Sequence, residues 1–424
     1  MRPLRAERKR PRERARRAVP PGRNARYRAS VSASGSSTAS PRLAAHRLDE
    51  AVALLRALGG PHGIHASLAE TANYRAVFTR DAVMAGVAGL LLDDPAVTRA
   101  FVTTLERLRA LQGPVGQIAS NFEVRREGEP PLVSYGTVVP RLDAATWYLV
   151  GVALGARAGA LDPAAFAGSV HAVVRLLDAL EYNGRHLLYV PAGGNWADEY
   201  VYEGYVLYDQ VLRAWGLRLL AGVYGEPAWA DKAARIGATI EARFRADAPA
   251  PEPPHPVAAF SPLGVRDVYD AAACSLLPLA GVAPALGADA LAWTAERFLA
   301  RGALPPAFHP VIQEGDPDWP ALRRYHLYAF RNHPHEYHNG GVWPVWLGWL
   351  ALALAGAGRD ADLARLRALV ATRLAEHPRF AFEEYLHGVT GEPRGTPRMA
   401  YTATGLVFLH LAGSDAQRRL LAAP

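Results

Sequence analysis

Apolar residues recur with the spacing of an α-helix along almost the whole chain after residue 40. The two-residue alternation of a half-buried strand is scarce. We therefore expect an all-α fold. The spacing predicts twelve helices, at about residues 42–58, 80–92, 95–111, 142–158, 163–181, 204–224, 228–245, 270–284, 288–301, 340–356, 360–376 and 398–412.

The predicted helices are of two alternating kinds. Odd-numbered ones are amphipathic, as in DADLARLRALVATRLAEH, which is typical of helices with one side in water. Even-numbered ones, such as GVWPVWLGWLALALAGAG, are apolar nearly all round and should be buried. Six such alternations predict an inner ring of six helices inside an outer ring of six, an (α/α)6 barrel that forms a single domain over residues 41–424. An open α-solenoid would give similar hairpins, but its repeats normally resemble one another, and these do not.

Polar motifs precede or begin the even-numbered helices. Since alternating hairpins point all inner helices the same way, these motifs should converge on one end of the barrel, its mouth. Helix N-termini also offer free N–H groups and positive potential that favour carboxylates. The longest segments without a helical pattern, 114–140, 247–266 and 303–338, should surround the mouth as loops. The motifs are Arg80 with Asp81, Arg141 with Asp143, residues 198–203, Asp267 with Asp270, and His338 with Asn339.

Charge is distributed unevenly along the chain. The formal net charge is +7, but residues 1–28 hold eleven Arg, one Lys and two Glu, or +10, which leaves 7 − 10 = −3 for the rest. Because the remainder is slightly acidic and shows no basic helix face, we expect no nucleic-acid partner.

Residues 1–40 are Arg-rich and then Ser-rich, which resembles a transit peptide, but we favour a disordered extension. They lack the apolar stretch of a secretory signal. The most apolar run, 342–357, is interrupted by Pro344 and several glycines, so we expect no membrane partner. A cytoplasmic enzyme is the default prediction, and assembly into a homo-oligomer stays open.

The stretch GNWADEYVYEGYVLYDQ, residues 194–210, sets Asp198, Glu199 and Glu203 among Trp196 and three tyrosines. A carboxyl group between aromatic rings loses hydration, so its pKa should rise toward the range in which it donates a proton at neutral pH. An acidic first turn that favours the helix dipole is the alternative interpretation.

Two further motifs join an arginine to an aspartate. In FTRDAV, Arg80 and Asp81 could hold sugar hydroxyls, because the guanidinium donates hydrogen bonds and the carboxylate accepts them. The alternative is an aspartate at a helix N-terminus beside a structural arginine. In RLDAATWY, Asp143 could contact a ligand or cap its helix, and Trp147 could supply an apolar floor.

The motif RNHPHEYHNGGVWP contains His333, His335 and His338. A zinc site is one interpretation, but the spacing matches no established ligand pattern, so we expect no metal and no cofactor. Cys274 is the only cysteine, which excludes an intramolecular disulfide and a multi-cysteine metal site. The glycine pair before Trp343 indicates a close approach of the backbone to a substrate or another loop.

In FEEYLHG, Glu383 and Glu384 are flanked by Phe382 and Tyr385, and one of the two glutamates is a reasonable partner for the carboxylate at 198 or 199. No Gly-x-Ser-x-Gly elbow, Walker loop or dinucleotide fingerprint occurs in a fitting context. A carboxylic acid, a carboxylate base and aromatic walls are the groups that a glycosidase uses.

These motifs together resemble those of the six-hairpin glycosidases, most of all the neutral/alkaline invertases, over about residues 74–410. The similar segments, in chain order, are YRAVFTRDAVMAGVAGLL, GQIASNFEV, RLDAATWYLVG, GYVLYDQVL, HNGGVWPVWL and FEEYLHG. A more distant resemblance is to glucoamylases. The resemblance implies an inverting hydrolase that cleaves a small α-glycoside or oligosaccharide, such as sucrose or an α-glucoside.

The resemblance also implies roles for individual residues. It puts the general acid at Asp198, or at Glu199 after a slip of one residue, and the base at Glu384. The substrate-binding residues that we expect are Arg80, Asp81, Asn121, Asp143, Trp147, Trp196, Tyr205, Gln210, His338, Asn339 and Trp343. NWADEY replaces the invertases' Asp-Arg-Arg segment and Phe78 stands for their Trp, which puts sucrose specificity in doubt more than fold or reaction type.

Two other functions remain open. A sugar epimerase or isomerase on the same barrel would use His338 or His335 for proton transfer, since fold does not fix function. A non-catalytic carbohydrate-binding relative would have Glu384 facing away from the pocket.

Overall fold

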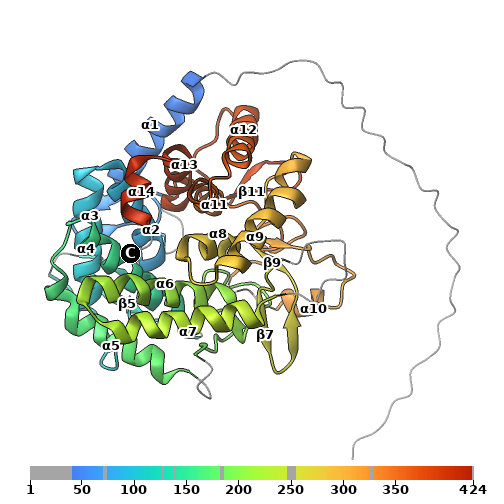
Figure 1. The fold of residues 1–424 in the computed structure, drawn as a ribbon. Helices are drawn as coiled ribbons and strands as arrows, with labels where there is room; N and C mark the ends of the chain where they lie inside the picture. Colours follow the sequence, from blue (N-terminus) through green and yellow to red (C-terminus); the bar gives the residue numbers. More distant parts are fainter. Residues whose placement is uncertain are drawn as a thin grey trace, which may run out of the picture. The chain divides into compact units, whose positions relative to one another are not determined.

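In the computed structural model, six helices of the described residues pack side by side in a closed ring (Figure 1). Each contacts the next, and the last closes against the first, which explains why their sequences are apolar on all sides. The inner helices are α2 (Thr79–Leu92), α4 (Leu142–Arg157), α6 (Leu207–Tyr224), α8 (Ala271–Ala280), α11 (Pro344–Gly356) and α13 (Ala400–Leu411). The structure describes residues 41–69, 74–126, 128–137, 139–181, 186–245, 255–324, 326 and 328–422, so the predictions for residues 1–40 lie outside it.

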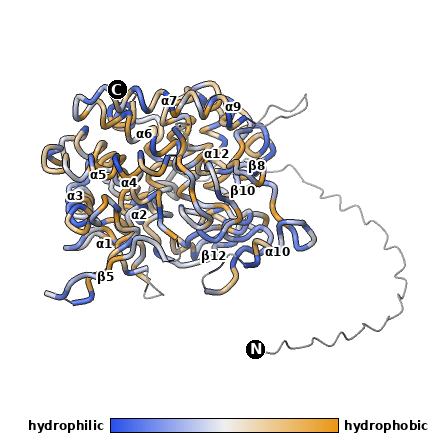
Figure 2. The backbone as a smooth tube through the Cα atoms, turned by 90° about the horizontal axis from the view of Figure 1, so that it is seen from below, coloured by the Kyte–Doolittle hydropathy of each residue, from blue (hydrophilic) through white to orange (hydrophobic). Residues whose placement is uncertain are grey.

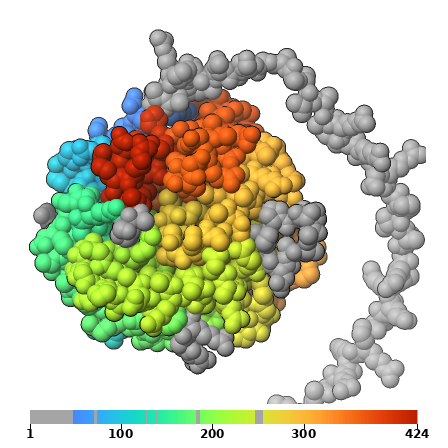
Figure 3. Space-filling view, viewed as in Figure 1, coloured from blue at the N-terminus to red at the C-terminus, as the bar shows by residue number. Residues whose placement is uncertain are grey.

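Amphipathic helices form the outer ring, and each packs against an inner helix. They are α1 (Pro41–Leu58), α3 (Pro95–Ala110), α5 (Ala167–Ala179), α7 (Pro227–Arg243), α9 (Pro284–Arg297) and α12 (Asp360–Glu376). Hydrophilic positions gather at the periphery (Figure 2), and the chain colours follow one another around one face until red meets blue (Figure 3). The architecture is the predicted (α/α)6 barrel.

Some helix limits differ from the prediction. The helix predicted from residue 204 begins at Leu207, because Tyr205 and Val206 form a strand, and the one predicted from 340 begins at Pro344. A proline suits the first helical position, where its missing N–H is not needed. Two short helices, α10 (Trp319–Leu322) and α14 (Asp415–Leu421), were not predicted. The 3-10 turns Pro163–Phe166 and Leu299–Arg301 fall within the predicted helices 163–181 and 288–301, at one end of each.

Short antiparallel strands connect the helices. They pair as β1–β2, β3–β4–β5, β6–β7–β8, β9–β10 and β11–β12, with registers such as Val77 opposite Phe122 and Tyr205 opposite Phe260. Strands β3, β6 and β9 lead directly into α2, α6 and α8, so they fix the first turn of each helix. The strands are β1 (Gly59–Gly60), β2 (Gly63–Ile64), β3 (Val77–Phe78), β4 (Asn121–Glu123), β5 (Leu132–Ser134), β6 (Tyr205–Val206), β7 (Ala259–Ser261), β8 (Gly264–Arg266), β9 (Tyr269–Asp270), β10 (Phe308–His309), β11 (Tyr385–Leu386) and β12 (Pro393–Arg394).

Two glycines allow α11 and α13 to approach closely. A Cβ atom at Gly348 would lie 2.5 Å from the carbonyl oxygen of Gly405, and one at Gly405 would collide with the backbone of Pro344. None of the described helices is long and apolar enough to cross a membrane.

Candidate active site

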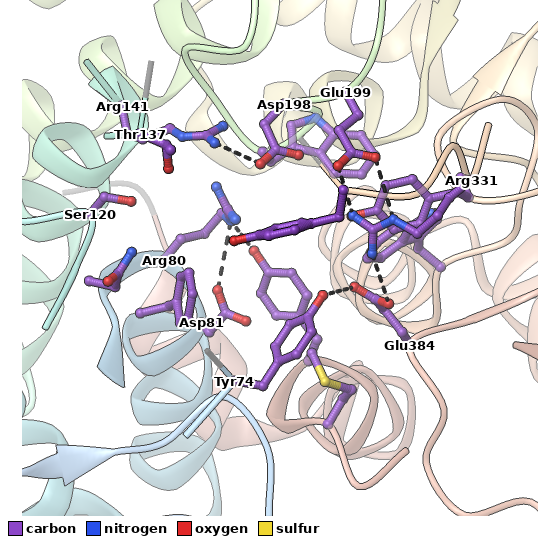
Figure 4. Close-up of a pocket in the computed structure, with 18 residues that line it drawn as sticks. Tyr74, Arg80, Asp81, Ser120, Thr137, Arg141, Asp198, Glu199, Arg331 and Glu384 are labelled. Carbon is purple, nitrogen blue, oxygen red and sulfur yellow. Dashed lines mark hydrogen bonds and ion pairs between the residues drawn. The ribbon is translucent and has the colours of Figure 1, made fainter. Parts of the chain in front are cut away.

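A pocket lies where the inner helices begin, at the predicted mouth (Figure 4). Its empty space, counted together with open solvent at the mouth, is about 880 Å³. The predicted loops 114–140 and 303–338 contribute to its lining, and 247–266 does not. The lining residues are Tyr74, Phe78, Arg80, Asp81, Ser120, Asn121, Thr137, Arg141, Trp196, Asp198, Glu199, Tyr328, Arg331, Tyr337, Trp343, Glu384, Met399 and Tyr401.

Asp198 lies on the loop that precedes β6, and Arg141 fixes this loop. The Arg141 guanidinium donates to the carbonyl oxygens of Gly193 at 2.6 Å and Asn195 at 3.1 Å, and to the Asp198 carboxylate at 2.7 Å. The Asp198 side chain keeps 27% of its surface exposed. A substrate in the pocket can therefore reach this carboxyl group.

Glu199 is much less accessible than Asp198, with 2% of the residue exposed. Arg331 donates from Nη2 to Oε1 at 3.1 Å and from Nε to Oε2 at 3.4 Å, and Asn332 donates to the Glu199 carbonyl oxygen at 2.7 Å. Both carboxylate oxygens of Glu199 thus have a protein donor. Of the two acidic neighbours, Asp198 is the one that stays accessible from the pocket.

Glu384 lies on the opposite side of the pocket, just before β11 (Figure 4). Tyr74 donates its hydroxyl to Oε1 at 2.9 Å, and the Thr396 amide donates to Oε2 at 3.4 Å. Burial raises the pKa of the Glu384 carboxyl, and the Arg331 charge and these hydrogen bonds oppose the rise. Its neighbour Glu383 instead accepts from the Ala381 amide at 2.8 Å. The structure therefore distinguishes the two glutamates of FEEYLHG.

Arg80 and Asp81 begin α2 at the base of the pocket. Arg80 is held by Asp143, 2.6 Å from Nη1, and by the hydroxyl of Tyr401. The Asp81 carboxylate lies 3.9 Å from Arg80 Nε. Burial raises the pKa of Asp81 to about 6, against the opposing charge of Arg80. The group can consequently exchange a proton in mildly acidic solution.

Aromatic rings form the remaining wall. Trp196 stacks on Phe308 at a centroid distance of 5.6 Å and meets Trp343 edge to face at 5.7 Å. The Trp196 Nε1 group is buried without a hydrogen-bond partner among the described residues. This wall gives the pocket an apolar side beside its charged groups.

The structure brings eight of the predicted site residues to the lining. They are Arg80, Asp81, Asn121, Trp196, Asp198, Glu199, Trp343 and Glu384. The other six, Asp143, Trp147, Tyr205, Gln210, His338 and Asn339, are not among the lining residues. Asp143 still contributes to the site, because its carboxylate accepts a hydrogen bond from the lining residue Arg80.

Three of these six residues have structural roles. Trp147 is buried beside Trp215 and Trp349 in the core of the ring. Gln210 bonds to the backbone of residue 188, and Asn339 to that of residue 312. The polar atoms of Gln210 and Asn339 therefore anchor backbone segments around residues 188 and 312.

Tyr205 lines a separate surface hollow, where it contacts Phe260. His338 is buried and stacked on Trp343 at 5.4 Å, and neither ring nitrogen has a partner among the described residues. Burial, followed by the charges of Arg331, Arg80 and Arg141, lowers the pKa of His338 well below its ordinary value. The imidazole is thus neutral at physiological pH.

Ten lining residues were outside the predicted set. Phe78 and Arg141 belonged to recognised motifs, and Tyr401 begins the last buried helix, so the rule that used helix starts could have found it. Arg331 and Tyr337 both belong to the histidine motif RNHPHEYHNGGVWP. Tyr74 and Ser120 lie in segments similar to those of invertases, Met399 lies in the predicted helix 398–412, and Thr137 and Tyr328 lie in two of the predicted loops. Among the described residues, no group of three or more His, Cys, Asp or Glu could hold a metal ion.

The fold is similar to that of solved glycosidases. A GH63 mannosylglycerate hydrolase from Thermus thermophilus, in complex with glucose, matches with a TM-score of 0.61 and 18% identity over 85% of this chain and 98% of that chain. A bacterial glucoamylase complexed with acarbose matches with a TM-score of 0.61 and 15% identity over 88% of this chain and 56% of that chain. A glycosidase variant in complex with glucose matches with a TM-score of 0.59 and 15% identity over 90% of this chain and 99% of that chain.

No protein-family model and no curated protein sequence matches the chain. At identities this low the likeness establishes the fold alone, an (α/α)6 barrel that this chain shares with these glycosidases. The narrower resemblance to neutral/alkaline invertases stays a prediction.

Proposed function

We propose that the protein is an inverting glycoside hydrolase that cleaves a small α-glycoside or oligosaccharide. The proposal rests chiefly on one observation: Asp198 and Glu384 reach the same pocket from opposite sides (Figure 4). Inverting hydrolysis requires an acid on the leaving-group side of the sugar and a base on the other. The glycosidase fold of the solved neighbours adds support.

In this mechanism, Asp198 protonates the glycosidic oxygen as the bond to the sugar breaks. Glu384 takes a proton from the water that attacks the opposite face of the sugar. The acid ends ionised and the base ends protonated, so proton exchange with solvent restores both. Arg141 holds the Asp198 side chain and its loop in place.

The charges of the pocket favour a neutral sugar. Arg80, Arg141 and Arg331 each form an ion pair with a carboxylate, so none is free to bind an anionic group. Arg80 and Asp81 instead offer a donor and an acceptor for hydroxyl groups. Glucosides and mannosides are candidates by analogy with the solved neighbours, and sucrose is a candidate by the resemblance to invertases.

The epimerase alternative has less support. It needs a histidine that exchanges protons with the substrate, but His338 is buried and neither it nor His335 lines the pocket. A non-catalytic relative is disfavoured because Glu384 lines the pocket instead of facing away from it.

Substitution of the two carboxyl groups tests the proposal. Asp198→Asn and Glu384→Gln should each lower kcat by about 10²–10⁴-fold, the usual contribution of a general acid or base. Hydrolysis would be measured on sucrose, trehalose, maltose, isomaltose and mannosyl glycosides, with the anomer of the first product detected by NMR. Glu383→Gln is the matched control and should retain activity, since Glu383 bonds to the Ala381 amide.

Near-full activity in both Asp198→Asn and Glu384→Gln would refute the two-carboxylate assignment. A product with the anomeric configuration of the substrate would refute inversion. Conversion of a free sugar without bond cleavage would favour the epimerase.

A further inference from the structure

Arg331 lies between the two walls of the pocket and contacts a carboxylate on each (Figure 4). Its Nη2 and Nε atoms donate to Glu199 at 3.1 and 3.4 Å. Its Nη1 atom lies 3.9 Å from Glu384 Oε2, which is too far for a hydrogen bond but close enough for attraction between charges. The guanidinium carbon lies 3.8 Å from the centre of the Tyr337 ring, a cation–π contact that helps to fix its position.

The two carboxylates therefore share one cation unequally. Glu199 is rigidly placed, because it is buried and its backbone carbonyl accepts from Asn332. Without Glu199, the guanidinium would be free to form a two-pronged pair with Glu384, as arginine does with carboxylates. Such a pair would occupy the oxygens that have to take a proton from water.

We propose that Glu199 and Arg331 form a positioning pair, an inference that rests on the hydrolase function proposed above. Glu199 holds the guanidinium away from Glu384. Arg331 then favours the ionised base through its charge while leaving the base's oxygens available to water. In this arrangement Glu199 is a positioning residue and Asp198 alone is the acid.

Other groups also act on Glu384, and a test has to separate them from Arg331. Tyr74 and the Thr396 amide donate hydrogen bonds, and Asp198 opposes ionisation through its charge. The further titratable groups coupled to Glu384 are Asp81, Tyr337 and Tyr385. Burial raises the pKa of Glu384, and the charge of Arg331, which forms the ion pair with Glu384, opposes that rise. Of the groups that lower the pKa of Glu384, Arg331 should therefore have the largest effect when it is removed.

The pH profile of kcat/KM tests the positioning pair, with the purified full-length chain and its best glycoside. Arg331→Met should move the acidic limb up by about one pH unit or more, because a nearby positive charge lowers a carboxyl pKa by roughly 1–3 units. Glu199→Gln should move the same limb down by about half to one unit, because Arg331 is released toward Glu384 and one negative charge is lost. It should also lower kcat by about tenfold while retaining the alkaline limb.

Two more variants complete the experiment. Arg331→Lys keeps the positive charge but not the planar guanidinium, so it should move the acidic limb up less than Arg331→Met does. If Arg331→Met does not fold, Arg331→Lys takes its place in the test. Arg418→Met removes the same charge from an exposed pair with Asp415 on α14, and should leave the limb in place.

Shifts of the acidic limb in the same direction in Arg331→Met and Glu199→Gln, or no shift in either, would overturn the positioning pair. Loss of the alkaline limb in Glu199→Gln, with a fall in kcat like that of Asp198→Asn, would overturn it as well and make Glu199 the acid. If instead Asp198→Asn and Glu384→Gln stay active, the proposed hydrolase mechanism fails, whatever the pH limbs do.

Discussion

Glu384 shows how burial and hydrogen bonding compete at a single residue. It is 4% exposed, which disfavours its charge, yet Tyr74, Thr396 and Arg331 all favour its ionised form. The pKa of Glu384 is raised on balance. A group in this state is well suited to act as a base near neutral pH, since a stronger base accepts a proton more readily.

The pH dependence of activity should reveal this raised pKa. The base has to be ionised, so kcat/KM is lost as the pH falls through the folded pKa, and the limb should lie above the ordinary value of 4.5. Tyr74→Phe removes a hydrogen bond to the ionised form and should move the limb further up, by about half a unit to one unit. The measurement is kcat/KM between about pH 3.5 and 8 for both proteins. A wild-type limb at or below pH 4.5, or a downward shift in Tyr74→Phe, would contradict this explanation.

The starts of the inner helices place the chemistry at the scale of secondary structure. Arg80 and Asp81 begin α2, Tyr401 begins α13, and Trp343 precedes α11. Their positions depend on how closely the inner helices pack, and α11 and α13 pack through glycine. Hydrophobic periodicity predicted these helices, but it did not predict the two- and three-residue strands before them, because so short a strand shows no alternation.

Gly348→Ala tests the close contact of α11 and α13. The new Cβ would meet backbone atoms of Gly405, which cannot move as a side chain can, so we expect a loss of about 1–3 kcal/mol in the free energy of unfolding. Gly356→Ala on the same helix is the control. Its Cβ would meet only Gln417 Nε2, at 3.8 Å, and the higher helix propensity of alanine should leave stability unchanged or slightly increased. Urea unfolding would measure both variants, and equal stabilities would refute the glycine contact.

At the scale of the whole molecule, the ring of inner helices brings together residues more than 300 positions apart, such as Tyr74 and Glu384. The basic segment, residues 1–28, lies outside the part of the sequence that lines the pocket. Residues 1–28 carry a charge of +10 in a chain whose net charge is +7, and the site draws its lining from residues 74–401. We expect this segment to have no part in the chemistry of the pocket.

Deletion of residues 1–38 tests that expectation. Residues 39–424 form a compact unit by themselves, so the shortened chain should keep its thermal midpoint within about 2 °C and its kcat/KM within about twofold. Its isoelectric point should fall below 7, because the remaining charge is negative. Thermal unfolding and the hydrolysis assay would measure the outcome. A large fall in either quantity would give the segment a structural or catalytic role.

The sequence by itself determined the barrel, because the alternation of fully apolar and amphipathic helices has few other ways to bury its apolar surface. It also placed Arg80, Asp81 and Asp198 at one end, since helix starts share a direction in such a ring, whereas Glu384 was predicted from the FEEYLHG motif and the resemblance to invertases. The resemblance to invertases put the base at Glu384 and the acid at Asp198 or Glu199. Only the tertiary structure shows that Asp198 is more exposed than Glu199 and that Glu383 bonds to the Ala381 amide.

The tertiary structure also showed which carboxylates the lining arginines pair with, and it buries Trp147, Gln210 and His338 outside the lining of the pocket. The physical reason is the same in each case. Periodicity records which side of a helix is buried, but it does not record which distant side chain completes a hydrogen bond or an ion pair. The partners Arg331 and Glu199 are 132 residues apart, and no local pattern connects them.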